Sequence, residues 1–358
     1  MSIKKIAQKV GASPATVSRV LNNPDYRCSK PGLRDKIWKA AIELNYTPNE
    51  AARNLKLGVK AEDNKIVYIN VLMTRADTNQ SDPFFSEILH VIETEVHKQG
   101  CILSKLWYRS LFSNDVRCDT ENIDRVISDM HKETEGKSDG LIILGRCNKN
   151  AIKKFCKAFG NVVTVNRNSS EYAVDEILCD GRKIASTAVE YLYSLGHKKI
   201  GYVGECKNEI RYSGYVEALN SHGLELLPEY VIATRQTEAD GYDSMLKFLQ
   251  SDDCPTGIYC ANDITAIGML KCLQKFKNHY PRPSIIASDD IEEAQFSKPM
   301  LTTVRIPRDE MGRFAVRMLL DRIKGGHNSV VRMELESKLM IRESCHNVSD
   351  SVWSDYCI

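Results

Sequence analysis

Charged and amide side chains follow several apolar segments of this 358-residue chain, in positions where they could bind a small polar molecule. Asn262 and Asp263 come after one apolar run, and Asp289 and Asp290 come after another. Arg211 lies near the start of a helical stretch that follows a third run. In parallel α/β sheets, ligands bind beyond the carboxyl ends of the strands, so these side chains are candidates for one binding cleft.

A second group of candidates lies earlier in the chain. The segment Asp82-Pro83-Phe84-Phe85 follows the first apolar run and opens a helix, and Arg146 stands at the end of another run. An inward arginine could favour an acidic or phosphorylated ligand. The alternatives are structural. The Phe pair can belong to the core, and Arg146 can pair with an acidic neighbour, which we favour.

The two aspartate pairs have a structural alternative as well. Asp263 and Asp290 can cap helices, because a carboxylate accepts hydrogen bonds from the free N–H groups of a first helical turn. We favour capping for Asp263 and ligand contact for Asp289.

The first 22 residues carry a different chemistry, with small polar and basic side chains on one face of a helix. Ser13 can cap this helix, and Pro14 can occupy its first position, where a missing N–H is harmless. Val17, Val20 and Leu21 form the inner stripe. The side chains left on the outer face are Thr16, Ser18, Arg19 and Asn22.

Two further helices are expected to hold that helix in place. One runs from a cap at Ser2 through Val10, and the other runs from about Pro31 to Asn45. A tight turn at Gly11 between two short helices is typical of a helix-turn-helix that enters the DNA major groove. The alternative is a small helical cap whose polar residues are merely solvated.

The charge distribution favours the DNA-binding interpretation. Residues 1–60 carry a net charge of +8, whereas the remainder of the chain carries −6. A basic N-terminal segment followed by an acidic remainder is expected if the N-terminal segment contacts DNA phosphates.

After Lys65 the chain alternates between short β-branched runs and amphipathic helices, such as 84–98, 182–195 and 263–276. This alternation predicts parallel sheets with right-handed crossovers, and the number of strands favours two doubly wound lobes. The predicted strands are 66–72, 101–106, 140–144, 162–165, 176–178, 199–203, 256–260, 284–287 and 302–306.

Several protein classes are disfavoured. The chain has no apolar run of about 18 residues and no signal-peptide pattern at its start, so we expect a cytoplasmic protein. Its twelve cysteines form no C-x-x-C pair, so we expect small buried hydrophobes, with neither a metal nor a cofactor. Phosphate-loop, nucleophile-elbow and H-E-x-x-H motifs are missing, which argues against an enzyme. His197 is expected in a surface turn.

The stretch from Ser13 to Asn22, followed by 44–49, resembles the head of the lactose-repressor and galactose-repressor family. The resemblance implies a transcription regulator in which Pro14, Ala15 and Arg19 face base edges. It also implies that Thr16, Ser18 and Asn22 hold phosphates. The link 23–33 is longer than the family's pattern, which leaves open whether Ser29 or Lys30 contacts phosphate.

The segment after Pro48 resembles the hinge helix of the same family. Asn49 can cap a short helix that ends at Gly58, and Ala52 and Leu55 match the family's Ala-x-x-Leu. In that family the hinge orders only on DNA, and its leucine wedges into a minor-groove step. Alternatively, Leu55 packs against its own domain.

Segments of the body resemble the family's effector domain, which is similar to periplasmic sugar-binding proteins; they include 195–200, 301–304 and 339–345. Carried over by position, Arg211, Asn262 and Asp289 bind ligand hydroxyls, while Phe84 and Phe85 supply an apolar face. This chemistry suits a sugar. Residues 262–267 resemble β-galactoside-responsive members, so a galactoside is one candidate. At residues 166–167, where members of the family often have Asp-Arg, this chain has Asn-Arg.

The expected organisation is an all-α helix-turn-helix domain (1–47), a hinge helix (48–58), a two-lobed effector-binding and dimerisation domain (62–345) and a short tail (346–358). The tail shows no heptads, so a tetramerisation helix is not expected. We expect a homodimeric repressor that binds a double-stranded operator, because one head covers only a half-site. The effector shifts an equilibrium between two lobe arrangements, and the sign of its effect on DNA binding stays open.

Two alternatives to a sugar-responsive repressor remain. One is a sugar-binding receptor of the same fold without a DNA role, which the basic head disfavours. The other is a regulator that senses a metabolite other than a sugar, for which Arg146 is the first residue to examine.

Overall fold

The computed structural model describes residues 3–22, 26, 32–43, 66–75, 83–171, 173–207, 209–276 and 282–348. The chain forms two compact units, Met1–Ile66 and Val67–Ile358. The predicted DNA contacts Lys30, Asn49, Ala52 and Leu55 lie outside the described residues, as does Asp82.

The N-terminal unit contains helices α1 (Ile3–Val10), α2 (Pro14–Asn22) and α3 (Leu33–Glu43). The turn between α1 and α2 uses Gly11 at φ +63, a conformation that glycine adopts without steric cost. The Ser13 hydroxyl caps α2 by accepting from the Thr16 N–H at 3.1 Å, as predicted. The predicted inner faces of the three helices form the core, which contains Ile6, Ala7, Val17, Val20, Leu21, Ile37, Ala40 and Ala41.

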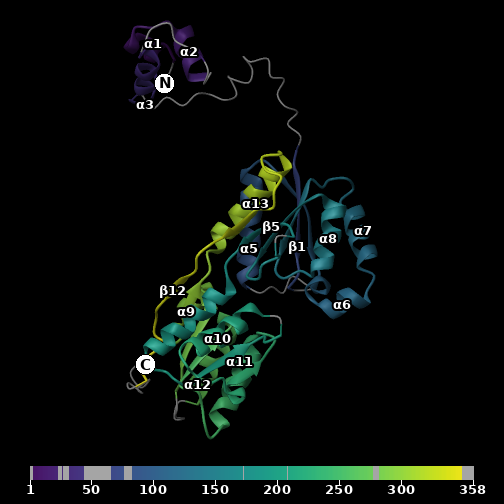
Figure 1. Cartoon of the computed structure of the whole chain (residues 1–358), viewed down its shortest axis with the longest axis vertical. Helices are drawn as coiled ribbons and strands as arrows, with labels where there is room; N and C mark the ends of the chain where they lie inside the picture. The colour runs from purple at the N-terminus through teal and green to yellow at the C-terminus, as the bar shows by residue number, and fades with distance from the viewer. Residues whose placement is uncertain are drawn as a thin grey trace. The chain divides into compact units, whose positions relative to one another are not determined.

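The second unit has two lobes, each built on a six-stranded sheet (Figure 1). The strand order of the first lobe is β2-β1-β3-β4-β5-β11, and every pairing in this sheet is parallel. The strands are β1 (Tyr68–Met73), β2 (Ile102–Tyr108), β3 (Gly140–Leu144), β4 (Asn161–Asn166), β5 (Asp175–Leu178) and β11 (Arg332–Glu334).

The second lobe repeats this doubly wound arrangement, with strand order β7-β6-β8-β9-β10-β12. Its last strand pairs antiparallel to β10, and the other pairings in this sheet are parallel. The strands are β6 (Ile200–Gly204), β7 (Val231–Ala233), β8 (Gly257–Cys260), β9 (Ser284–Asp289), β10 (Thr302–Arg305) and β12 (Lys338–Met340).

Helices cover both faces of each sheet because the crossovers alternate sides. The first lobe carries α5 (Pro83–Lys98), α6 (Asp115–Thr120), α7 (Ile123–Glu133), α8 (Lys149–Phe159) and α13 (Arg308–Ile323). The second lobe carries α9 (Gly181–Ser194), α10 (Ile210–Ser221), α11 (Glu238–Gln250) and α12 (Asp263–Lys275). Short 3-10 turns lie at Ser110–Ser113, Pro228–Tyr230 and Glu292–Gln295. Helix α13 lies late in the sequence yet packs on α5, so the chain returns to the first lobe after β10 (Figure 1).

The structure corrects one sequence-based expectation here and agrees with another. His197 is buried, and its ring contacts the Thr256 hydroxyl at 3.1 Å and the His346 carbonyl at 3.0 Å, so the predicted surface turn is wrong. Six of the ten described cysteines are buried and all ten are free, which agrees with their interpretation as small hydrophobes.

Candidate functional site

Three of the predicted ligand contacts meet at one edge of the second lobe's sheet. Arg211 lies in the first turn of α10, Asn262 directly precedes α12, and Asp289 ends β9. Strands β6, β8 and β9 are neighbours and parallel, so the segments that follow them converge at their carboxyl ends. All three side chains are buried, with exposed fractions of 1%, 5% and 2%.

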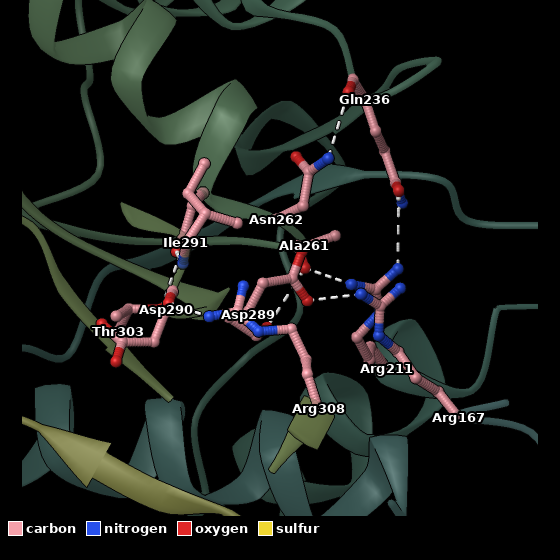
Figure 2. Close-up of polar contacts among 12 residues, drawn as sticks. Arg167, Arg211, Gln236, Ala261, Asn262, Asp289, Asp290, Ile291, Thr303 and Arg308 are labelled. Atoms are coloured by element: carbon pink, nitrogen blue, oxygen red, sulfur yellow. Dashed lines mark hydrogen bonds and ion pairs between the residues drawn. The ribbon is translucent and has the colours of Figure 1, made fainter. Parts of the chain in front are cut away.

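The Arg211 guanidinium is held by neighbours within its own lobe (Figure 2). Its Nε donates to Glu209 Oε1 at 2.9 Å, and another nitrogen donates to Glu209 Oε2 at 3.0 Å. A further hydrogen bond goes to the Ala261 carbonyl. Although burial opposes ionisation of Glu209, the charge and hydrogen bonds of Arg211 lower the pKa of this carboxyl to about 2. Both groups are therefore ionised inside the protein.

Asp289 reaches the opposite lobe through Arg167, which follows β4. The two side chains form an ion pair with exposed fractions of only 2% and 7% (Figure 2). The Arg167 guanidinium also lies 4.0 Å from the centre of the Phe84 ring, in cation–π contact. The backbone of Asp289 adopts φ +136, a conformation that is unfavourable for any residue other than glycine. Tertiary contacts therefore hold this carboxylate in place.

Phe84 and Phe85 are buried at the start of α5, with exposed fractions of 1% and 2%, and their rings meet edge to face at 5.0 Å. Both belong to a hydrophobic core that contains buried residues of both lobes. Their core placement agrees with the structural alternative. The Arg167 guanidinium covers one face of the Phe84 ring.

The capping residue of α12 is Asn262, which corrects the expectation that Asp263 has this role. The Asn262 amide oxygen accepts from the Thr265 N–H at 3.2 Å, and its amide nitrogen donates to the Gln236 carbonyl at 3.1 Å. Asp263 instead accepts from the Thr303 hydroxyl at 2.6 Å and from the Ile291 N–H at 2.9 Å. Burial and the nearby Asp289 carboxylate raise the pKa of Asp263 to about 7.

Asp290 is a structural anion rather than a helix cap. Its two carboxylate oxygens accept from Arg305 Nε and from an Arg342 nitrogen, each at 2.5 Å. Its carbonyl accepts from Arg308 at 2.6 Å (Figure 2). Arg308 also pairs with Glu87 at 3.1 Å. Since Arg308 lies on α13 of the first lobe and Asp290 follows β9 of the second, this network connects the two lobes.

Arg146 lies apart from these contacts, in the loop between β3 and α8. It forms an ion pair with Asp115 and donates to the Ser113 carbonyl at 3.1 Å. Burial opposes ionisation of Asp115, but hydrogen bonds from Asn148 and Arg146 lower the pKa of its carboxyl. The prediction that Arg146 pairs with an acidic neighbour is therefore confirmed.

Sequence reasoning gave no site role to Arg167, and it missed Glu209 and Gln236 altogether. The Gln236 amide oxygen lies 3.4 Å from a nitrogen of Arg75 and 3.5 Å from one of Arg211, so it bridges the two lobes. Its amide nitrogen is buried and has no hydrogen-bond partner among the described residues. Neither residue follows an apolar run directly, so no sequence signal pointed to them.

On the N-terminal unit, α2 presents the predicted DNA contacts outward. Ser13, Pro14, Ala15 and Arg19 are exposed, and Thr16 and Ser18 are half-buried. The Ser13 and Thr16 hydroxyls lie 2.8 Å apart, and the Arg19 guanidinium lies 5.9 Å from the centre of the Tyr26 ring. Asn22 ends the helix. Small polar groups and a basic side chain at the start of a helix suit base edges and phosphates.

Over the described ranges, no group of three or more His, Cys, Asp and Glu side chains could hold a metal ion. Within the same ranges, no helix is long and apolar enough to cross a bilayer.

A helix-turn-helix unit followed by a two-lobed α/β unit, with a polar cluster between the lobes, defines a ligand-responsive DNA-binding regulator. Residues 2–49 match the model for bacterial regulatory proteins of the lacI family, and residues 189–345 match a periplasmic binding protein-like domain. The transcriptional repressor CytR of Escherichia coli is 31% identical, over 96% of both chains. The chain therefore belongs to the LacI family of transcription regulators and is not an enzyme.

Solved structures agree with this assignment. A complex of the transcriptional regulator CelR with cellobiose aligns with a TM-score of 0.66 and 23% identity, and the match covers 96% of this chain and 100% of CelR. A LacI family regulator from Enterococcus faecium with bound ribose aligns with a TM-score of 0.64 and 25% identity. That match covers 78% of this chain and 99% of the other.

Proposed function

We propose that this regulator acts in the cytoplasm as a homodimeric repressor. We further propose that a neutral sugar bound between its lobes controls its affinity for operator DNA. Pro14, Ala15 and Arg19 face base edges, and Thr16 and Ser18 hold phosphates. A dimer is needed because one helix-turn-helix reads one half-site.

The observation that carries the sugar assignment is the charge balance of the buried cluster. Two cations, Arg167 and Arg211, are matched by two anions, Glu209 and Asp289. A charged ligand would leave one buried charge uncompensated, at a cost of several kcal/mol. A neutral ligand with many hydroxyls can instead exchange hydrogen bonds with these groups and with the amides of Gln236 and Asn262.

The known ligands of similar proteins support this class. CelR binds cellobiose, and the Enterococcus faecium regulator binds ribose. Both ligands are uncharged and rich in hydroxyl groups. A galactoside remains one candidate on the resemblance of residues 262–267.

Calorimetric titration of the full chain with neutral mono- and disaccharides tests the proposal, with the corresponding sugar phosphates alongside. We expect at least one neutral sugar to bind and to change operator affinity in fluorescence anisotropy. Arg211→Ala should weaken binding by about 2–5 kcal/mol, because it removes a buried charged donor. The matched control is Arg235→Ala, since the Arg235 side chain is 90% exposed.

Asp289→Asn provides a second variant that keeps the size of the side chain, in case Arg211→Ala reduces folding. Thermal unfolding reports whether each variant is folded. Binding of sugar phosphates alone, or equal sugar binding by wild type and the folded cluster variants, would contradict the proposal.

A further inference from the structure

The loop 324–331, which joins helix α13 to strand β11, contacts the rest of the first lobe through the His327 ring. The Nε2 atom of this ring lies 2.9 Å from Asp175 Oδ2, and its Nδ1 atom lies 2.5 Å from Asp321 Oδ2. Asp175 begins β5, and Asp321 lies in the last turn of α13. The ring therefore bridges the sheet and the helix through two carboxylates.

Only the protonated form of the ring can donate to both carboxylates. An ionised carboxylate accepts hydrogen bonds and donates none, whereas a neutral imidazole has one N–H and one nitrogen that accepts. An imidazolium carries an N–H on each nitrogen. Because a neutral ring would place an accepting nitrogen against one of the two carboxylates, deprotonation removes one of the two hydrogen bonds.

The charged groups around the ring favour its protonated form. Asp321 and Arg322 face it from α13, and Asp175 faces it from β5. The hydrogen bond to Asp321, and then that to Asp175, raise the pKa of His327 above its ordinary value, although burial and the Arg322 guanidinium oppose this shift. The His327 side chain is 17% exposed and that of Asp175 is fully buried, so solvent screens their contact less than it would screen a surface pair.

The buried Asp175 carboxylate has other partners besides His327. Arg322 donates to both of its oxygens, to Oδ1 at 2.7 Å, and the Val331 N–H donates to Oδ1 at 2.8 Å. Although burial opposes ionisation of Asp175, hydrogen bonds from Arg322 and Val331 lower the pKa of its carboxyl. Loss of the His327 contact would therefore release the loop without leaving a buried charge unpaired.

The loop leads directly into a segment that connects the two lobes. Strand β11 pairs with β5 in the first lobe, and residues 335–337 join it to β12, which pairs with β10 in the second lobe. The loop also packs closely on α13, since a Cβ added to Gly326 would lie 2.2 Å from Asp321 Oδ1. The His327 contacts therefore fix the start of this connection to the first lobe.

We propose that His327 is a pH-sensitive switch, whose imidazolium holds the loop 324–331 and the start of the β11 connection on the first lobe and whose deprotonation releases the loop. Because the pKa is raised in the folded state, the stability that the contact contributes is fully present below the ordinary histidine value of about 6.5. It is lost as the pH rises through the folded value. Mildly acidic conditions therefore favour the fixed loop, and alkaline conditions favour the released one.

Nuclear magnetic resonance of the histidine rings in the full chain tests the switch directly. The His327 signal is the one missing from His327→Gln, and its titration midpoint should lie above about 6.5. Asp321→Asn keeps the size of the side chain and removes its charge, so it should lower that midpoint. A wild-type midpoint at or below the ordinary value, or one that Asp321→Asn leaves unchanged, would overturn the proposal.

Cleavage by trypsin after Lys324 measures release of the loop, because this exposed residue lies at its start. At about pH 6.5, His327→Gln should be cut about 10-fold faster than wild type, which is the scale of one hydrogen bond between charged groups. At about pH 9 the two rates should agree, since the wild-type ring is then neutral. The ratio of the two rates at each pH cancels the pH dependence of trypsin itself.

The matched control is His97→Gln, which replaces an exposed histidine on α5 of the same lobe. This variant should be cut at the wild-type rate at both pH values. A rate ratio for His327→Gln that is the same at both pH values would show that the ring holds the loop without titrating, and the switch would be wrong. Thermal unfolding reports whether each variant is folded. If His327→Gln does not fold, the signal that Asp321→Asn shifts identifies His327, and the wild-type midpoint decides.

Discussion

The ionised states of Glu209 and Arg211 depend on the contact between these two side chains. Arg211 is buried, only 10% of the Glu209 side chain is exposed, and each residue satisfies the charge of the other. Arg211 was singled out from the sequence because of its place after an apolar run, but its role as the partner of Glu209 was not. An arginine side chain is long enough to reach many positions, so its sequence position does not determine its contacts.

The Glu209 carboxyl predicts how stability depends on pH. Its pKa is about 2 in the folded protein against 4.5 for the free side chain, so it stabilises the fold above the higher value. This contribution is lost as pH falls from about 5 toward 2, as the unfolded state takes up the proton first. Urea unfolding across this range should show a steep acid loss in wild type. Glu209→Gln should be less stable at pH 7 and show a weaker acid dependence. An unchanged pH profile would contradict the prediction.

We expect Arg19 to contribute to the sequence specificity of operator binding. Arg19→Ala should weaken operator binding by about 1–3 kcal/mol, which is the typical contribution of one bidentate contact to a base edge. Binding to non-specific DNA should change much less. Fluorescence anisotropy with operator and scrambled duplexes measures both. Lys39→Ala, at an exposed position of α3, serves as a control. Equal losses on both duplexes would make Arg19 a phosphate contact instead.

At the scale of elements, helices α11 and α12 approach each other closely. A Cβ added to Gly268 would lie 2.0 Å from the Glu238 carbonyl oxygen, and one added to Gly241 would lie 1.9 Å from the Thr265 carbonyl oxygen. Both glycines lie inside helices, where helix propensity disfavours them by about 1 kcal/mol each. The sequence showed the helical pattern of 263–276, but only the packing of the two helices explains why glycine is present there.

Gly268→Ala tests this close approach. Propensity alone predicts a gain of about 1 kcal/mol, whereas the contact with backbone atoms of α11 predicts a loss of about 1–3 kcal/mol or more. Urea unfolding measures the free energy directly. A stabilised variant would mean that the helices separate at little cost.

At the scale of the whole two-lobed unit, a buried ion pair connects the two lobes. Arg167 and Asp289 meet across the lobes although they are 122 residues apart in sequence. Arg308, on α13 of the first lobe, donates to the Asp290 carbonyl of the second lobe at 2.6 Å and forms a second connection. Because breaking the buried ion pair leaves one charge unpaired, that pair favours the arrangement in which the lobes touch. A sugar that competes for Asp289 would shift this equilibrium.

Arg167→Met tests the connection between the lobes. The variant removes the charge and leaves Asp289 buried without its cation, so the lobes should separate to hydrate the carboxylate. Small-angle scattering of the full chain without ligand should show a larger radius of gyration than wild type. Arg182→Met, which removes a more exposed pair within one lobe, should leave the radius unchanged. An unchanged radius in Arg167→Met would show that the pair does not hold the lobes together.

Local periodicity and short motifs in the sequence predicted the three-helix head, the nine strands β1–β6 and β8–β10, and the family. They did not show the edge strands β7, β11 and β12, because each is only three residues long and none of its residues is fully buried. The tertiary structure was needed to show that Asn262 rather than Asp263 caps α12. It was also needed to show that Arg167 and Gln236 belong to the polar cluster between the lobes. Those contacts depend on how the chain crosses between the lobes, which local patterns do not encode.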